Sequence, residues 1–374
     1  MDAFVGRRER LAAAMAACGA WPERSPWVRE AFDALPRHRF APERLWRWDG
    51  DAYLPIDRAE DPEAWADEVY GGPDDPAVTR VNDGVAVSSM SCPSVVADML
   101  DALLVQPGHR VLELGAGSGW NAALLAWRAG PGRVVSVEVD AGLAATASGH
   151  LRVAGVDTAV EIADGVGGWP AGAPFDRVIA TYAVERVPWA WIEQTRPGGR
   201  IVAPWGRLGH VALTVAEDGR SATGWVQGLA MFMPARGSRA ARGWRQVRGD
   251  EAPRGERAPK RDPRALRDNA HLLFALRVAL PDVRITTGGD HRGEGATAWL
   301  DDGVASWATL VAPDDGEPVA YLGGPRDLLD EVERAWDDWR ELGEPGLYDH
   351  GMTVEPDRQY VWCHDPVSGP RWPM

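Results

Sequence analysis

Three serines stand close together before an apolar run of the chain, in the segment SSMSCPS at 88–94. Hydroxyl groups crowded in this way suggest a nucleophile, but no histidine lies nearby in the sequence, and a serine without a base is a poor nucleophile. Ser91 stands where a serine can cap the following helix, with Pro93 in its first turn. Capping and the positioning of a ligand are both open for Ser91, and loop structure and ligand contact are equally open for Ser88 and Ser89.

A glycine-rich stretch, VLELGAGSGW at 111–120, is the second feature that can do chemistry. The pattern predicts a strand that runs into Gly115, Gly117 and Gly119 and then into a helix. Glycines at such a turn let the backbone bend tightly and approach a ligand closely. Loops of this kind occur in dinucleotide sites and in S-adenosylmethionine sites.

Three details favour S-adenosylmethionine. The glycines are spaced GxGxG, with Trp120 where the third glycine of GxGxxG would stand, and Glu113 precedes the loop by two residues, as in methyltransferases. Glu138 ends the next expected strand, where a carboxylate can accept hydrogen bonds from ribose hydroxyls. Residues 111–127 contain no Lys or Arg, which suits a ligand that offers a carboxylate and no phosphate to the helix N-terminus. A nicotinamide or flavin site and a degenerate fold are the alternatives.

Two further positions follow later expected strands. Asp164 and Gly165 come at the end of AVEIAD, where an acid can meet the amino group of adenine, although Asp164 alone is equally a turn residue. Tyr182 ends DRVIATY, where it either lines a pocket or packs against its neighbours.

These residues lie in a region where strands and helices alternate, with helices expected after Gly119 and at 141–155. That order predicts an α/β fold with a parallel sheet covered on both faces. The expected strands are HRVLEL (109–114), RVVSVEV (133–139), AVEIAD (159–164), DRVIATY (176–182) and GRIVAPW (199–205).

The composition describes a soluble globular protein of 374 residues, 45% hydrophobic and 25% charged. No apolar run approaches a membrane span, and the alanine-rich stretch 7–20 is better explained by a helix than by a secretion signal. Three widely spaced cysteines form neither a disulfide framework nor a zinc site, so we expect a reducing cytoplasm and no metal. A net charge of -15 argues against a general nucleic-acid binder.

Composition changes along the chain indicate four parts. Residues 1–80 are expected to be helical and loop-rich, residues 81–235 to form the α/β core, and residues 262–374 to form an acidic α+β unit. Between them, residues 236–261 hold nine Arg or Lys against three acids, which predicts a flexible linker or loop. A contact with an acidic substrate, or with the acidic unit that follows, is the alternative for this basic segment.

A series of stretches resembles the protein-L-isoaspartate O-methyltransferase family. The segment around Ser91 is similar to the one that holds the family's active-site serine, usually written TISxPxM, and the glycine loop is similar to its S-adenosylmethionine loop. Such a set is specific, because a generic methyltransferase would share only the glycine loop. In order, the stretches are ALPRHRFAPE (34–43), DAYLPI (51–56), VSSMSCPSVVADML (87–100), VLELGAGSGW (111–120), FDRVIATYA (175–183) and GGRIVAPWG (198–206).

The resemblance implies a class I methyltransferase core, Rossmann-like, with S-adenosylmethionine as cofactor. It places Ser91, with Ser89 beside it, at the catalytic site. The substrate pocket is expected to differ from that of repair enzymes, because Met90 and Tyr182 depart from the family pattern; with Ser88, they are assigned to substrate binding. The positions implied to bind the cofactor are Glu113, Gly115, Gly117, Gly119, Glu138, Asp164 and Gly165.

Residues 262–374 have no counterpart in compact repair enzymes and resemble an extension of actinobacterial homologues that tailor ribosomally made peptides of omega-ester, lanthipeptide and lasso types. That resemblance implies methylation of an aspartate in a modified, ring-constrained peptide, whose ester then cyclises to aspartimide, with the extension binding the peptide. Isoaspartyl repair is the first alternative, and a non-catalytic peptide-binding module is the second. The oligomeric state is not indicated.

A carboxylate acceptor also resolves the missing histidine. A carboxylate is ionised at neutral pH, so it can attack a sulfonium methyl group without a general base. Ser91 would then orient the acceptor by hydrogen bonding and would not act as a nucleophile.

Overall fold

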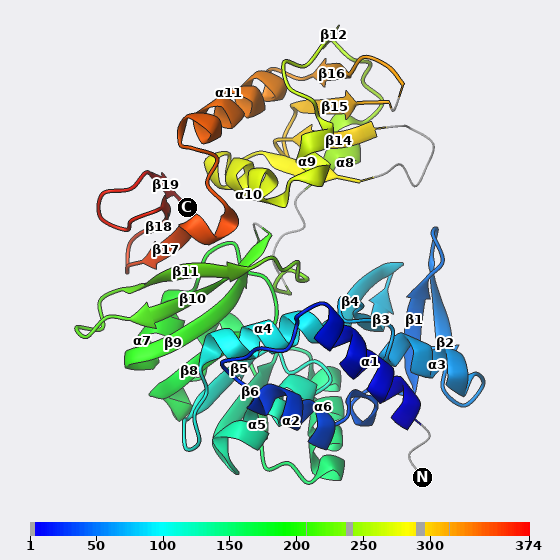
Figure 1. Ribbon diagram of the computed structural model, residues 1–374, viewed down its shortest axis with the longest axis vertical. Coiled ribbons are helices and arrows are strands. Elements are labelled where there is room, and N and C mark those ends of the chain that lie inside the picture. The colour runs from blue at the N-terminus through cyan, green and yellow to red at the C-terminus, as the bar shows by residue number, and fades with distance from the viewer. Residues whose placement is uncertain (1–3, 207, 237–241, 289–295, 314) are drawn as a thin grey trace. The chain divides into compact units, whose positions relative to one another are not determined.

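The computed structural model describes residues 4–206, 208–236, 242–288, 296–313 and 315–374. It divides into two compact units (Figure 1). The first contains Met1–Gly206, His210–Arg236 and Thr353–Asp357, and the second contains Arg207–Gly209, Gly237–Met352 and Arg358–Met374. No helix among the described residues is long and apolar enough to cross a membrane.

The first unit opens with two helices, α1 (Val5–Ala17) and α2 (Trp27–Ala34). The helix expected near the N-terminus is therefore present, with Leu11 and Met15 buried on one side of it. A short 3-10 turn, η1 (Arg37–Arg39), follows α2 and brings Arg37 into the interior, while Arg39 is exposed.

A small antiparallel sheet comes next, in the order β2-β1-β3-β4. Its β3–β4 hairpin turns at Asp83 and Gly84, which both have positive φ, as the common two-residue hairpin turn requires. The expectation of helices and loops over 1–80 missed β1, β2 and the start of β3, because these strands are short and their apolar residues do not alternate cleanly. The elements are β1 (Arg44–Trp48), β2 (Tyr53–Asp57), α3 (Pro62–Val69), β3 (Ala77–Asn82) and β4 (Val85–Met90).

The core of the first unit is a sheet in the order β11-β10-β9-β8-β5-β6-β7. The strands from β9 to β7 pair in parallel and β10 pairs with β11 antiparallel, so the α/β prediction is confirmed. The strands are β5 (Val111–Leu114), β6 (Val134–Glu138), β7 (Ala159–Ile162), β8 (Phe175–Ala180), β9 (Thr195–Trp205), β10 (Gly209–Val215) and β11 (Ala222–Gly228). The helices are α4 (Pro93–Leu103), α5 (Trp120–Ala129), α6 (Ala141–Ala154) and α7 (Trp189–Glu193).

The second unit is built on an antiparallel sheet in the order β12-β16-β15-β14-β13. Apolar residues of α9, α10 and α11 pack with alternate residues of these strands in one core. The strands of this sheet are β12 (Gly255–Arg257), β13 (Arg284–Thr287), β14 (Ala296–Asp301), β15 (Trp307–Val311) and β16 (Val319–Gly323). Outside this sheet, the chain ends with β17 (His350–Val354), β18 (Gln359–Cys363) and β19 (Arg371–Pro373), which are neighbours in the order β19-β18-β17. The helices are α8 (Trp244–Arg248), α9 (Arg264–Asp268), α10 (Ala270–Ala279) and α11 (Leu328–Glu341).

The basic segment 236–261 differs from the expected linker. Part of it forms α8, and part forms β12, which pairs with β16 at the edge of the sheet. Nη1 of Arg257 lies 3.1 Å from Oε2 of the buried Glu333 on α11. Arg261 forms an ion pair with Asp337 on the same helix. The positive charges in this part of the segment therefore serve contacts with the acidic residues that follow, as the alternative interpretation held.

Candidate active site

The loop between β5 and α5 has the conformation that its glycines permit. Gly115, Gly117 and Gly119 all have positive φ, at 98°, 54° and 86°. A Cβ atom on Gly115 would collide with the Thr181 hydroxyl, and one on Gly119 would lie 3.2 Å from a backbone oxygen of α6. A Cβ atom on Gly117 would meet no described atom within 4 Å. The loop is thus packed tightly on both sides and leaves open space at its middle glycine, which suits close approach of a ligand.

Glu138 connects this loop to the end of β6. Its side chain is almost fully buried, one oxygen accepts the Gly117 N–H at 3.1 Å, and the other accepts the Asp140 N–H at 3.1 Å. A carboxylate at this point can also accept hydrogen bonds from a ribose. Glu138 therefore fits the cofactor position expected from the sequence.

Glu113 has a different role from the expected cofactor contact. It is completely buried, and its carboxylate accepts hydrogen bonds from Asn121 at 2.8 Å and from Ser136. Burial raises the pKa of Glu113 to about 7, against the lowering effect of these two hydrogen bonds. The side chain thus joins β5, α5 and β6 beneath the loop and supports it from inside.

Asp164 and Gly165 form the other side of the site. Asp164 caps the short 3-10 turn Gly165–Gly167 by accepting the Val166 N–H at 3.0 Å. The Trp191 indole donates to the Gly165 carbonyl at 2.8 Å and fixes this turn against α7. Sequence reasoning did not single out Trp191, because a tryptophan gives no sign of which carbonyl it will reach.

Tyr182 lies among these cofactor positions. Its ring edge is close to where a Cβ atom on Gly115 would stand, and its hydroxyl is close to where one on Gly165 would stand. Burial, and after it the nearby Asp164 and Glu138 carboxylates, raise the pKa of the Tyr182 phenol. The structure thus places Tyr182 between the two cofactor segments, and its assignment to the substrate side is not what the geometry favours.

Strand β4 separates the serines by side-chain direction, because successive residues of a strand point to opposite sides. Ser88 and Met90 are 7% and 3% exposed, and the Ser88 hydroxyl accepts a hydrogen bond from Thr79 at 2.9 Å. Both point into the interior, which does not favour direct contact with a substrate, and their assignment to substrate binding stays a prediction. Ser89 and Ser91 alternate with them and are half-buried.

The hydroxyls of Ser89 and Ser91 have no hydrogen-bond partner in the described part of the chain. The N-cap residue of α4 is Cys92, and no side chain caps this helix. Helix capping by Ser91 is therefore excluded, and both hydroxyls remain available to a ligand.

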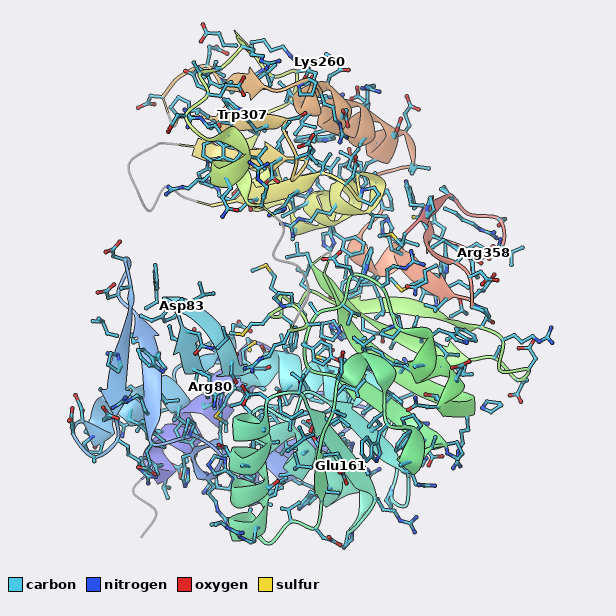
Figure 2. All side chains as sticks on the ribbon, turned by 180° about the vertical axis from the view of Figure 1, so that it is seen from behind. Arg80, Asp83, Glu161, Lys260, Trp307 and Arg358 are labelled. Carbon is cyan, nitrogen blue, oxygen red and sulfur yellow. The ribbon has the colours of Figure 1, made fainter. Side chains whose placement is uncertain are left out.

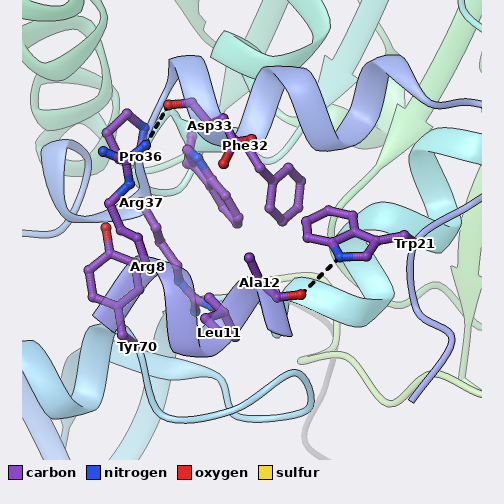
Figure 3. A pocket seen from close by; sticks show the side chains of 10 residues that line it. Arg8, Leu11, Ala12, Trp21, Phe32, Asp33, Pro36, Arg37 and Tyr70 are labelled. Atoms are coloured by element: carbon purple, nitrogen blue, oxygen red, sulfur yellow. Dashed lines mark hydrogen bonds between the residues drawn. The ribbon is translucent and has the colours of Figure 1, made fainter. Parts of the chain in front are cut away.

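A buried arginine holds the backbone next to Ser91. The Arg37 guanidinium donates a hydrogen bond to the Met90 carbonyl at 2.9 Å. Its Cζ atom lies over the Trp120 ring, 5.4 Å from the ring centroid. Burial lowers the pKa of Arg37 to about 10, so the group remains charged at neutral pH. It borders a cavity of about 30 Å³ beside α1 and α2 (Figure 3), together with Tyr70.

Comparison with known proteins agrees with this geometry. Residues 22–238 match the model of the protein-L-isoaspartate(D-aspartate) O-methyltransferase family. The chain belongs to this family.

Individual relatives support the same conclusion. A protein-L-isoaspartate O-methyltransferase of Methanopyrus kandleri is 37% identical over 207 residues, which are 54% of this chain and 78% of that relative. One of Methylorubrum extorquens is 40% identical over 194 residues, 52% of this chain and 72% of the relative. A solved structure of a protein-L-isoaspartate O-methyltransferase aligns with 96% of this chain and 100% of its own, at a TM-score of 0.53 and 21% identity, and shows the shared fold.

The protein is thus an S-adenosylmethionine-dependent carboxyl methyltransferase with the class I fold. The residues that would hold the cofactor are the three glycines of the loop, Glu138, and the Asp164–Gly165 turn. Bound there, S-adenosylmethionine supplies an electrophilic methyl group on a sulfonium centre. No group of His, Cys, Asp and Glu in the described residues is arranged to hold a metal ion.

Proposed function

We propose that this enzyme methylates the free carboxylate of L-isoaspartyl residues in proteins or peptides, as in the repair of aged proteins. The proposal rests on two hydroxyl groups that have no partner among the described residues, in a chain that belongs to this family. They are those of Ser89, on β4, and Ser91, just after β4. Its relatives from Methanopyrus kandleri and Methylorubrum extorquens are protein-L-isoaspartate O-methyltransferases. The aspartimide interpretation has no such support.

The proposed chemistry needs orientation more than acid or base groups. The acceptor carboxylate is already ionised at neutral pH, and its charge is lost as it attacks the methyl group. A neutral hydroxyl can hold one carboxylate oxygen while the other attacks, without stabilising the ground-state anion as strongly as a cation would. Ser91 is the residue to which we assign this role, with Ser89 as a second donor. Exclusion of water and correct placement supply the remaining rate enhancement.

A pair of matched peptides tests the proposal. One peptide contains a single L-isoaspartyl residue, and the other has the same sequence with a normal aspartyl residue. Incubation with methyl-labelled S-adenosylmethionine is expected to label the isoaspartyl peptide and to leave the aspartyl peptide unlabelled. Label in the aspartyl peptide alone, or in neither peptide, would contradict the proposal.

Methylation of an aspartate in a ring-constrained ribosomal peptide, followed by aspartimide formation, is the second candidate. What favours it is that the family match ends at residue 238, so most of the second unit lies outside it. The whole-chain alignment weakens this argument, because the solved isoaspartate methyltransferase is similar in fold over 96% of this chain. Label in a constrained peptide and loss of methanol, with no label in the isoaspartyl peptide, would support this candidate. A peptide-binding module without catalysis would label neither substrate.

A further inference from the structure

Two arginines converge on one carboxylate in the first unit. Nη1 of Arg80, on β3, lies 2.7 Å from Oδ2 of Asp140, and Nη1 of Arg236 lies 2.6 Å from the same oxygen. The other oxygen of Asp140 accepts the Leu143 N–H at 2.9 Å and caps α6. The negative charge of Asp140 therefore faces two positive charges, and both carboxylate oxygens of Asp140 already accept hydrogen bonds.

This surplus of positive charge contrasts with ion pairs elsewhere in the same unit. Arg7 faces two acids, Glu63 and Asp67, and Arg44 forms a pair with Asp57. Asp140 remains ionised near neutral pH, since its capping hydrogen bond and then the two arginines lower its pKa to about 2. The cluster of Arg80, Asp140 and Arg236 thus carries a net charge of +1.

The cluster lies between the cofactor residues and the serine strand. Asp140 follows Glu138 by two residues and donates its N–H to the Glu138 carboxylate at 3.1 Å. Arg236 donates to the Val87 carbonyl of β4 at 3.1 Å. Val87 precedes Ser91 by four residues, which corresponds to roughly 13 Å of extended chain. β4 ends the order of its sheet, where an extended peptide can approach it.

Both arginines can bind a second anion by donating hydrogen bonds to it. Their side chains are 33% and 32% exposed, and each guanidinium has five N–H donors. Among the described residues, Asp140 is the partner of Arg80, which leaves its Nε and Nη2 groups without an acceptor. Gly142 lies against this group, and a Cβ atom there would crowd Arg80 Nη2 at 3.3 Å. Figure 2 labels Arg80 in the first unit.

We propose that Arg80 and Arg236 bind a carboxylate of the substrate peptide other than the one that is methylated. The enzyme therefore prefers acceptors with an Asp or Glu side chain within about four residues of the methylated residue. The methylated carboxylate itself is excluded as the ligand of this cluster, because a guanidinium pair would stabilise the charge that methyl transfer removes. This inference rests on the proposed function and adds a charge preference to it.

Four isoaspartyl peptides, in two pairs, test the inference. The members of a pair differ only in carrying Glu or Gln three residues from the isoaspartyl residue, on its N-terminal side in one pair and on its C-terminal side in the other. The wild-type enzyme is expected to show a KM about 2- to 5-fold lower for one of the Glu peptides than for its Gln partner, as partly exposed ion pairs allow. Arg236→Gln and Arg80→Gln are expected to reduce this ratio to about 1. Arg44→Gln, which removes an exposed ion pair of β1 and β2, is the matched control and keeps the wild-type ratio.

The outcomes distinguish failure of this charge preference from failure of the proposed function. Equal KM values for both pairs in the wild type, with normal methylation, overturn the charge preference and leave the proposed function standing. A ratio that persists in both folded arginine variants also overturns it. Failure to methylate any of the peptides overturns the proposed function and this inference with it. Because both arginines contact Asp140, which caps α6, a folding defect in one of the two variants leaves the other variant to decide.

Discussion

The Arg37 guanidinium donates to the Met90 carbonyl at 2.9 Å, and Met90 directly precedes Ser91. Two other nitrogens of this guanidinium, Nε and Nη1, are buried without a partner among the described residues. The Asp75 carboxylate is near enough to raise the pKa of Arg37, but burial has the larger effect. A buried cation of this kind is costly, so we expect it to have a task other than stability. That task is to fix the backbone from which the Ser91 hydroxyl reaches the substrate.

Replacement of this cation is predicted to separate activity from stability. Arg37→Met removes a buried charge and keeps a side chain of similar length, so the free energy of unfolding is expected to stay the same or to rise. The Met90 carbonyl loses its donor and Ser91 loses its fixed position, so kcat/KM is expected to fall about 10-fold or more. Denaturant unfolding and steady-state kinetics measure the two effects. A folded Arg37→Met enzyme with wild-type kcat/KM would show that Ser91 needs no such anchor.

The two faces of β4 give a matched pair of variants. Ser91→Ala removes a free hydroxyl and is expected to lower kcat/KM by about 10- to 100-fold, the usual effect of one hydrogen bond to a charged group. The dissociation constant for S-adenosylmethionine should remain within about 2-fold of the wild type, an effect of less than 0.5 kcal/mol. Ser88→Ala, on the buried face, is expected to change stability slightly and activity little. Equal losses of activity in the two variants would contradict the assignment of faces.

Glu138 gives a prediction on cofactor binding. Glu138→Ala removes the acceptor of the Gly117 N–H and the group expected to hold the ribose. The dissociation constant for S-adenosylmethionine should rise by about 10- to 100-fold, as measured by isothermal titration calorimetry. The control is Glu161→Gln on the neighbouring strand β7 (Figure 2), which should bind the cofactor as the wild type does. Unchanged affinity in Glu138→Ala would place the ribose elsewhere.

Glu113 links stability to pH. Its pKa in the folded protein is about 7 and thus lies above the ordinary value of 4.5. The folded state therefore holds this proton more tightly than the unfolded state, and its contribution to stability is complete below pH 4.5 and is lost as the pH rises to about 7. A loss on the order of 2–3 kcal/mol is expected across this range.

Glu113→Gln tests this linkage, because a neutral amide can keep partners in Asn121 and Ser136. The free energy of unfolding of the variant should fall less between pH 5 and pH 7.5, by about the contribution assigned to Glu113. Unfolding curves of both proteins at several pH values measure the difference. Parallel pH profiles for wild type and variant would show that Glu113 does not titrate in this range.

The sequence predicts the cofactor side of the site better than the substrate side. Gly115, Gly117 and Gly119 could be identified because a backbone with positive φ restricts the residue type. Glu138 could be placed because it ends a strongly apolar strand. The burial of Glu113 could not be foreseen, since spacing alone cannot show whether an acid at the end of a strand faces the ligand or the core.

The substrate side depends on features that no local pattern reveals. Ser88 and Ser89 could be distinguished only after Val85–Met90 was known to be a strand, because alternation then decides which hydroxyl is buried. Arg37 was not assigned a role, since a charged residue gives no local sign that it will be buried. The basic segment was taken for a linker because its acidic partners on α11, such as Glu333, lie about 75 residues further along the chain.

The central claim is that the free hydroxyl of Ser91 orients an isoaspartyl carboxylate for methylation. Transfer of label from methyl-labelled S-adenosylmethionine to matched isoaspartyl and aspartyl peptides, by wild type and Ser91→Ala, tests it most directly. We expect rapid labelling of the isoaspartyl peptide by the wild type, about 10- to 100-fold slower labelling by the variant, and none of the aspartyl peptide. No label in the isoaspartyl peptide, or equal labelling by the two enzymes, would contradict the claim.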